Sequence, residues 1–249
     1  MVPPKDRLWA DPFVWRQDNR NFIFLEELLY KEQKGFISVL EIDDSGKYHL
    51  PEKVLEEDYH MSYPFLIEDH GELYMIPETY ENRTIQIYRC TGFPKGWKLE
   101  KVLMKDVMAV DTTIFFQDDT YWMFTNIASH EATSTYDELY LFYSDSLLSD
   151  NWMAHPENPI VTDVKNARPA GNLFRKEGKL YRPSQNCSIH YGYGMQINEV
   201  LELNKYHYRE KTVESIDPDW ADDLVATHTL NSAGDLTVID ALIRRRGTI

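Results

Sequence analysis

Acidic side chains stand at matching points of several aromatic, strand-like runs, and their pattern is suited to acid–base chemistry on a sugar. Asp11 is the second residue of "ADPF", Asp111 is the second residue of "VDTTIF", and Glu78 ends "YMIPE". Inverting cleavage of a glycosidic bond needs a carboxylate as base and a carboxylic acid for the leaving oxygen, roughly 6.5–9.5 Å apart. We predict Asp11 as the base and Glu78 as the acid, because aromatic surroundings and a second carboxylate raise the pKa of a glutamate. Asp111 would orient the sugar or tune that acid.

Further polar side chains recur at the ends of the same runs and are predicted to bind substrate. The set is His60, Ser62, Tyr63, Arg168 and His228 where runs open, with Glu26, Asn126, Gln185 and Asp240 where runs close. Arg168 can pair with a substrate carboxylate or phosphate, or neutralise the acids as a structural ion pair, and the sequence leaves both open. His228 can help to hold a calcium ion or a water in a central channel, although a histidine satisfied by its neighbours is the commoner case. No Cys/His spacing indicates zinc, so no metal ligand and no cofactor is assigned.

Five segments of one shape position these residues. They begin near residues 10, 62, 110, 167 and 227, and each has an apolar strand, a turn rich in Gly, Asp or Asn, and a second apolar strand with a polar end. Third strands are expected over 36–42, 84–90, 139–144 and 194–200, and outer strands over 98–104 and 208–216. The pattern predicts an all-β fold: one domain over 1–249 that is a five-bladed β-propeller with four-stranded antiparallel blades. A β-sandwich is the alternative, but it does not require five matching hairpins.

The propeller geometry brings the polar set to one place, because the first strands of the blades line the central channel. The structural alternative is that each polar residue caps a strand end or holds water, since Asp before Pro is a common turn element. For the whole set a site is favoured, because the polar positions recur while the turns and outer strands vary. Aromatic side chains near the expected mouth are candidates for stacking on a sugar, namely Trp9, Trp15, Tyr63, Tyr80 and Tyr191.

The composition of the chain limits the classes of partner that it is expected to bind. Lys+Arg number 26 and Asp+Glu 41, which gives a formal net charge of −15 and disfavours nucleic acid and anionic membrane surfaces. The chain has no run of 18 apolar residues, so membrane insertion is not expected. The first ten residues lack the apolar core of a secretory signal, and Cys90 and Cys187 are interpreted as reduced thiols. These features predict a cytoplasmic protein.

The motifs "ADPF", "HMSYPF", "YMIPET", "VDTTIF", "RPAGNLF", "YRPSQNC" and "THT" resemble a known family. It is the propeller domain at the N-terminus of plant glucosamine inositolphosphorylceramide transferases, of which bacterial relatives occur alone or beside formyltransferase modules. The resemblance runs from about Trp9 to Asp240. That domain is similar, more distantly, to five-bladed glycosidases of families 43, 32 and 68, where an Asp of the first blade acts as base or nucleophile and a further Asp and a Glu complete the site. The resemblance implies the first role for Asp11; Glu78 and Asp111 match less closely, because "SYPF" stands where the second blade should carry an Asp.

Sequence and resemblance together favour a carbohydrate-active, glycoside hydrolase-like enzyme that cleaves or transfers a glycosidic bond of a carbohydrate or sugar conjugate. One alternative is a noncatalytic module that binds a carbohydrate or nucleotide sugar and serves a glycosyl- or formyltransferase. A second alternative is a protein-interaction propeller, which would bind through its blade rims or outer strands.

Overall fold

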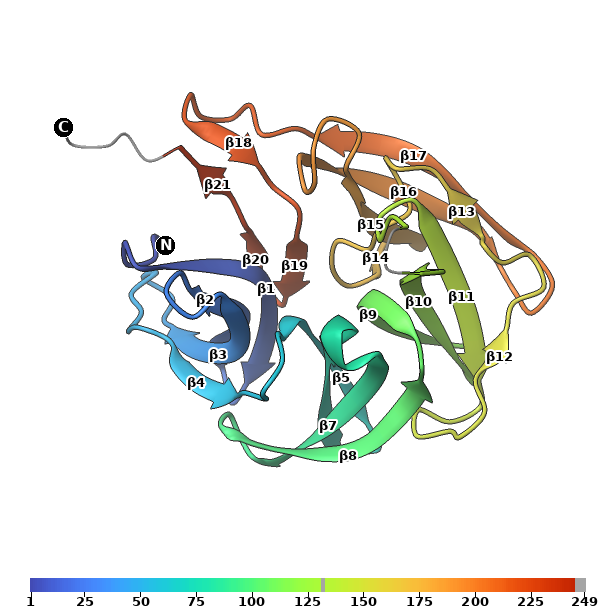
Figure 1. The fold of residues 1–249 in the computed structure, drawn as a ribbon, viewed down its shortest axis with the longest axis horizontal. Helices are drawn as coiled ribbons and strands as arrows, with labels where there is room; N and C mark the ends of the chain where they lie inside the picture. Colours follow the sequence, from blue (N-terminus) through green and yellow to red (C-terminus); the bar gives the residue numbers. More distant parts are fainter. Residues whose placement is uncertain (131–132, 245–249) are drawn as a thin grey trace.

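The computed structural model describes residues 1–130 and 133–244, which form antiparallel sheets arranged around a common centre (Figure 1). The first blade consists of β1 (Arg7–Gln17), β2 (Arg20–Leu29), β3 (Lys34–Ile42) and β4 (Glu52–Leu55). The second blade consists of β5 (Ser62–Asp69), β6 (Glu72–Glu78), β7 (Thr84–Gly92) and β8 (Gly96–Lys105), with the short 3-10 helix η1 (Tyr80–Asn82) between β6 and β7. In both blades the strands pair in chain order, so each blade is a meander whose first strand is innermost.

The other half of the ring repeats this plan with variations. The third blade consists of β9 (Met108–Gln117), β10 (Thr120–Ala128), β11 (Glu138–Ser144) and β12 (Met153–Ala154), and β13 (Val161–Thr162) also pairs with β11. The fourth blade consists of β14 (Phe174–Lys176), β15 (Lys179–Asn186), β16 (Gly194–Leu203) and β17 (Tyr208–Ile216). The last repeat contains β18 (Leu224–Ala226), β19 (Leu230–Ala233), β20 (Leu236–Ile239) and β21 (Leu242–Ile243).

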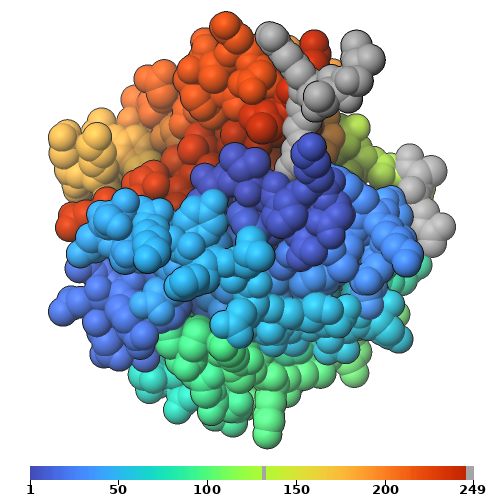
Figure 2. Space-filling view, turned by 90° about the vertical axis from the view of Figure 1, so that its left-hand side faces the viewer, coloured from blue at the N-terminus to red at the C-terminus, as the bar shows by residue number. Residues whose placement is uncertain are grey.

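The prediction of five four-stranded blades is wrong in its number, because the described residues form four blades. The fifth repeat divides into two separate two-stranded ladders, β19 with β20 and β18 with β21. Its strands are only two to four residues long, and β20 alternates between half-buried and exposed side chains. A strand without a buried face gains little from adding a neighbour. Instead, β19 lies beside β1, where the Asn231 amide donates to the Pro12 carbonyl at 2.9 Å. Figure 2 shows the N-terminal residues, in dark blue, meeting the orange and red last repeat on this side.

One residue with a left-handed backbone conformation lies within the inner strand of each of the first three blades. Asp11, Tyr63 and Asp111 have φ values of 49°, 44° and 51°, and the hydrogen-bond register shifts beside each of them. Such φ values are unfavourable for residues other than glycine, so the surroundings must hold them. The Tyr63 amide donates to Asp11 Oδ2 at 3.2 Å, and the Tyr63 hydroxyl accepts from the Gly171 amide at 2.8 Å. These bulges therefore tie the first, second and fourth blades together at the centre.

Apolar side chains fill the spaces between neighbouring blades. Phe13 contacts Tyr63 and Phe65 edge-on, with ring centroids 4.8 and 6.1 Å apart, in a buried cluster that continues through β6 and β9. A second cluster joins the third blade to the fourth around Phe124 and Tyr208. Successive side chains of a strand point to opposite faces of the blade. Each face of a blade therefore packs its apolar side chains against one neighbouring blade.

The strand predictions can be compared directly. The expected third strands correspond to β3, β7, β11 and β16, and the two expected outer strands to β8 and β17. The short outer strands β4, β12 and β13 were missed, because two to four residues carry no readable alternation. Both cysteines are free thiols, as expected. In the described part of the chain, no helix has the length and apolar character needed to cross a membrane.

We expect Gly171→Ala to destabilise the ring strongly. Gly171 has φ +129°, and an added Cβ would lie 2.1 Å from the Leu230 carbonyl oxygen and 2.8 Å from Asn231 Oδ1. The fourth blade would therefore have to move away from the last repeat, at a cost of about 2–4 kcal/mol in the free energy of unfolding. Urea denaturation measures this change. The matched control is Gly178→Ala, which also has a positive φ but no atom within 4 Å, and equal losses in both variants would contradict the close packing.

Candidate functional site

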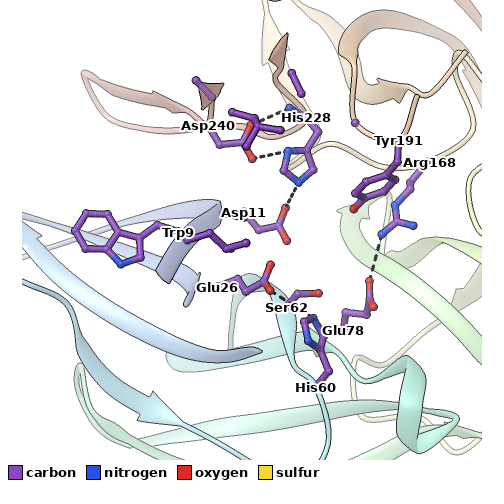
Figure 3. A pocket seen from close by; sticks show the side chains of 16 residues that line it. Trp9, Asp11, Glu26, His60, Ser62, Glu78, Arg168, Tyr191, His228 and Asp240 are labelled. Atoms are coloured by element: carbon purple, nitrogen blue, oxygen red, sulfur yellow. Dashed lines mark hydrogen bonds and ion pairs between the residues drawn. The ribbon is translucent and has the colours of Figure 1, made fainter. Parts of the chain in front are cut away.

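A pocket of about 380 Å³ opens where the inner strands meet, and most of its polar walls come from residues predicted from the sequence (Figure 3). The predicted residues that line it are Asp11 on β1, Glu26 on β2, His60 before β5, Ser62 on β5, Glu78 on β6, Arg168 before β14, His228 before β19 and Asp240 after β20. Trp9 and Tyr191, expected as stacking aromatics, also line it. The volume falls at the lower end of the range for small-molecule sites.

Asp11 and His228 form the centre of the pocket. His228 Nε2 lies 3.3 Å from Asp11 Oδ1, and His228 Nδ1 lies 2.7 Å from Asp240 Oδ2. Burial alone would lower the pKa of His228, but Asp240 and then Asp11 raise it to about 10, so the ring is an imidazolium at neutral pH. The same cation lowers the pKa of Asp240 against the effect of burial. Burial raises the pKa of Asp11 to about 6, with His228 opposing the rise, so Asp11 is mostly ionised at neutral pH.

Glu26 lies beside Asp11 and carries a proton at neutral pH. Burial first, and then the charge of Asp11, raise the pKa of Glu26 to about 8. His60 Nε2 lies 3.4 Å from Glu26 Oε1, while His60 Nδ1 accepts from the Gly35 amide at 3.0 Å. The Gly35 bond places the imidazole proton on Nε2, facing Glu26. Burial lowers the pKa of His60, so this histidine is neutral.

Arg168 holds Asp111 and Glu78 together on the opposite side of the pocket. Arg168 Nε lies 2.5 Å from Asp111 Oδ2, and Nη2 lies 3.2 Å from Asp111 Oδ1 and 3.4 Å from Glu78 Oε2. Nη1 donates to the Thr135 hydroxyl at 3.1 Å, so all three guanidinium nitrogens have protein partners. Burial and then Asp111 raise the pKa of Glu78 well above its ordinary range, with Arg168 opposing them. Of the two roles left open for Arg168, this geometry matches the internal ion pair.

Four predicted site residues lie outside the pocket wall. Tyr63 is fully buried between blades, and Gln185 donates to Asp111 Oδ2 at 2.8 Å behind the wall. Asp111 itself lies under Arg168, with only 2% of its surface exposed. Asn126 is buried, and its amide has no hydrogen-bond partner among the residues that the structure describes. They can reach a ligand only through other side chains.

Two of the suggested aromatics point elsewhere as well. Trp15 packs against the core of the first two blades, and the Tyr80 hydroxyl contacts Met108 Sδ at 3.8 Å. Tyr191 lies at the pocket mouth, with its ring 4.9 Å from the Arg168 guanidinium carbon and 5.8 Å from the His228 ring. Tyr191 is 51% exposed, so a face remains available for a ligand.

Sequence reasoning missed several supporting residues. The Thr229 hydroxyl donates to Asp11 Oδ1 at 2.8 Å, and its place beside His228 in "THT" was the available signal. Gly192 lies against His228, where an added Cβ would be 3.2 Å from the His228 Cβ. Gly35 leaves room for the His60–Glu26 contact, since a Cβ there would lie 2.8 Å from Glu26 Oε1. A single glycine in a loop gives no sequence signal for such a role.

A metal ion could be considered at the centre, because ligand atoms of Asp11, His228 and Asp240 lie within 4.8 Å of one another. A metal-bound histidine must offer an unprotonated nitrogen. Here both ring nitrogens of His228 face carboxylates, and the pKa of the ring is raised to about 10. A metal ion at this position would therefore have to displace a proton from His228.

The fold defines the class: a β-propeller, an architecture that solved glycoside hydrolases also have. Native arabinanase of Bacillus subtilis is similar with a TM-score of 0.67 and 13% identity, covering 95% of this chain and 89% of that one. A family 117 glycoside hydrolase of Zobellia galactanivorans has a TM-score of 0.61 and 10% identity, covering 85% and 71%. At these identities the similarity establishes the fold alone.

Sequence comparison places the chain in one family within this fold class. The model described as "Glucosamine inositolphosphorylceramide transferase 1, N-terminal" matches residues 4–220, and the chain belongs to this family. Glucosamine inositolphosphorylceramide transferase 1 of Oryza sativa subsp. japonica is 35% identical over 207 residues, which cover 82% of this chain and 28% of the relative. The protein of the same name from Arabidopsis thaliana is 34% identical over 207 residues, covering 82% and 27%. The chain thus spans less than a third of the length of these relatives, and the resemblance stated from sequence motifs is confirmed.

We expect stability to fall as pH rises, and Glu26→Gln to reduce that fall. The raised pKa of Glu26 means that its contribution is complete below its ordinary value of 4.5 and is lost as pH rises through about 8. Between about pH 5 and about pH 8.5 the wild type should therefore lose at least about 1 kcal/mol more than Glu26→Gln. Urea denaturation at both pH values measures the difference.

The control for this measurement is Glu32→Gln, an exposed glutamate outside the pocket. Its pH profile should follow that of the wild type. Part of the fall will remain in Glu26→Gln, since the stabilisation from His228 is also lost as pH rises toward about 10. Identical profiles for Glu26→Gln and wild type would show that Glu26 is ionised in the folded protein.

Proposed function

We propose that the central pocket binds the sugar unit of a carbohydrate or glycoconjugate and acts on its glycosidic bond by hydrolysis or transfer. The observation that carries the proposal is the division of protonation states within one pocket. Asp11, with a pKa of about 6, is mostly ionised at neutral pH, whereas burial keeps Glu78 protonated. Two carboxyl groups whose protonation states differ in this way can serve as base and acid in the same reaction.

In this proposal Asp11 is the general base. Its Oδ1 is held by the Thr229 hydroxyl and by His228, and its Oδ2 by the Tyr63 amide, so the carboxylate is fixed from three sides. It would take the proton of a water in hydrolysis, or of an acceptor hydroxyl in transfer, as that oxygen forms a bond to the anomeric carbon.

Glu78 is the proposed general acid. It would donate its proton to the leaving oxygen as the glycosidic bond breaks, and so balance the proton taken by Asp11. Asp111 would act through Arg168, which it holds at 2.5 Å and which in turn contacts Glu78. Glu26 and His60 would then position sugar hydroxyls, since both have proton donors at the pocket wall.

The comparisons support carbohydrate as the ligand class. The relatives that share this family carry glucosamine and a transferase in their name, and the fold neighbours are named as glycoside hydrolases or arabinanases. These names describe those proteins. They support the proposal here because the fold, and in the family the sequence as well, are shared.

A second candidate is a sugar-binding module that serves a transferase activity located elsewhere. Two observations favour it: the chain spans 28% of its curated relative, and the Arg168 contact to Glu78 opposes the protonated form that acid catalysis requires. In this case the same pocket would bind the sugar, and its carboxyl groups would only orient it.

Turnover by Asp11→Asn and Glu78→Gln separates the two candidates. The substrates are nitrophenyl glycosides and natural oligosaccharides, including amino sugars, and the released sugar is quantified. If the pocket is catalytic, each variant should lose at least about 100-fold in kcat while the fold is retained. The matched control is Asp119→Asn, an exposed carboxylate at the β9–β10 turn, which should keep full turnover.

The anomer released by the wild type, read by NMR, would show whether the reaction inverts. Absence of turnover on all substrates, combined with sugar binding that survives in both variants, would contradict catalysis and support the binding module. Absence of both turnover and sugar binding would contradict the proposed function altogether.

A further inference from the structure

The outer edge of the last repeat has no neighbouring strand in the described part of the chain. β20 pairs only with β19, and β21 follows β20 toward the rim of the ring and pairs only with β18 (Figure 1). Between them the Asp240 amide donates to the Thr229 carbonyl at 3.2 Å, so β20 and β21 act as one continuous strand. Each complete blade has two further strands beyond its second strand. The backbone groups on this edge therefore point out of their own sheet, where they can pair with another strand.

We call residues 235–244 the edge segment, and it lacks the protection that the long outer strands have. The outer strand β8 carries three lysines, and β17 carries an arginine and a lysine. From Leu236 to Ile243 the edge segment contains no Lys, Arg or Pro, and its one charged side chain, Asp240, is turned toward His228 (Figure 3). Charged and proline side chains are what usually prevent an exposed edge from pairing with another chain. This edge is therefore open to pairing.

Apolar side chains are exposed along and beside the same edge. Ile239 is 39% exposed and Leu242 59%. Together with Trp220 and Tyr30 they border a hollow of about 530 Å³. A single exposed apolar side chain needs no explanation, but several around one hollow mark an interaction site. Specific interfaces bury about 800 Å² on each partner, so a partner would have to cover this surface as well as pair with the edge.

The edge segment is complementary to a second copy of itself in antiparallel pairing. When Ile239 lies opposite Asp240 of the second copy, Asp235 lies opposite Arg244, and the residues between them are mostly apolar. A twofold axis repeats every pair, so opposite charges meet at both ends of the paired segment. Asp235 and Arg244 are both exposed, so a second copy can reach them.

The neighbouring registers are less favourable. A shift of one residue in one direction would place the two Asp240 residues opposite each other, and like charges in opposite positions are destabilising. A shift of one residue in the other direction would place Asp235 opposite the apolar Ile243 and so remove the charge pairs. The charge pattern therefore favours one register, and it favours a second copy of this chain as the partner.

We propose that two copies of the chain form a twofold-symmetric dimer in which their edge segments pair antiparallel, with β20 of each copy opposite β21 of the other. The strands β19 and β20 of one copy and β21 and β18 of the other would then form one shared sheet of four strands, the strand number of a complete blade. A two-stranded hairpin is marginally stable by itself, so each copy would stabilise the last repeat of the other. The inference is independent of the proposed sugar chemistry, because it rests on the edge and the charges of the last repeat.

The first test measures the mass of the wild-type chain by sedimentation equilibrium, which should give twice the mass of one chain at micromolar concentration and dissociation on dilution. Thr237→Lys should weaken the dimer at least about tenfold, because it places an unpaired charge opposite the apolar Leu242. Trp220→Ser should weaken the dimer as well, since it removes apolar surface that the second copy covers. Circular dichroism checks that the fold is kept, and if Thr237→Lys does not fold, Trp220→Ser alone gives the comparison.

The charges at the ends of the edge segment give a sharper test. Asp235→Arg alone, or Arg244→Asp alone, would place like charges opposite each other at both ends, so each variant should weaken the dimer at least about fivefold at low salt. An equimolar mixture of the two variants should associate as tightly as the wild type, because every end then joins opposite charges again. Arg244 also lines a hollow with Asp222 and Asp223. The mixture therefore separates contacts between chains from effects within one chain.

The matched control is Glu214→Arg, a charge reversal at an exposed position of the outer strand β17, and it should leave the dimer unchanged. A wild-type chain that is a monomer at every concentration would overturn the inference, as would a dimer that Thr237→Lys and Trp220→Ser leave intact. Loss of the dimer in Glu214→Arg would place the interface on the fourth blade instead. Failure of the mixed charge variants to associate would exclude the antiparallel pairing of the edge segments.

Discussion

The charge balance of the central pocket is the constraint on which the rest of the site depends. Four carboxyl groups line one pocket: those of Asp11, Glu26, Glu78 and Asp240. A fifth, that of Asp111, lies directly beneath Arg168. The cations among these groups are Arg168 and His228. Ionised carboxylates cannot gather away from water unless cations pair with them or protons neutralise them. The fold uses both solutions: cations beside Asp11, Asp111 and Asp240, and protons on the two glutamates.

Arg168 contacts the two carboxyl groups on its side of the pocket unequally. Its two contacts to Asp111 are 2.5 and 3.2 Å, whereas its contact to Glu78 is 3.4 Å. Because attraction falls with distance, the guanidinium is committed mainly to Asp111. Burial first, and then the negative charge of Asp111, raise the pKa of Glu78, and Arg168 offsets this rise only in part. One arginine thus forms a close ion pair with Asp111 and only a longer contact with the buried Glu78.

Much of this could be predicted from the sequence, and the failures have a common physical cause. Repeated hairpins with polar ends indicated the propeller and brought eight predicted residues to the pocket wall. Tyr63 was misplaced because a bulge with positive φ adds a residue to the inner strand and changes the alternation of side chains. Asn126 is related to Glu26 and Glu78 by register, yet it is buried below the wall, since its neighbours and not its position decide exposure. Packing glycines such as Gly192 are visible only in three dimensions.

The incomplete last repeat connects the error in blade number to the surface beside the pocket. A full fifth blade would place further strands beyond β20 and cover its outer side chains. In the described residues β20 instead pairs only with β19, so Ile239 remains exposed, while β21 turns back to β18 and leaves Leu242 exposed. The same short repeat supplies His228, Thr229 and Asp240 to the charged centre. The short strands of the last repeat therefore supply the residues that complete the polar site. They also leave an apolar surface exposed directly beside it.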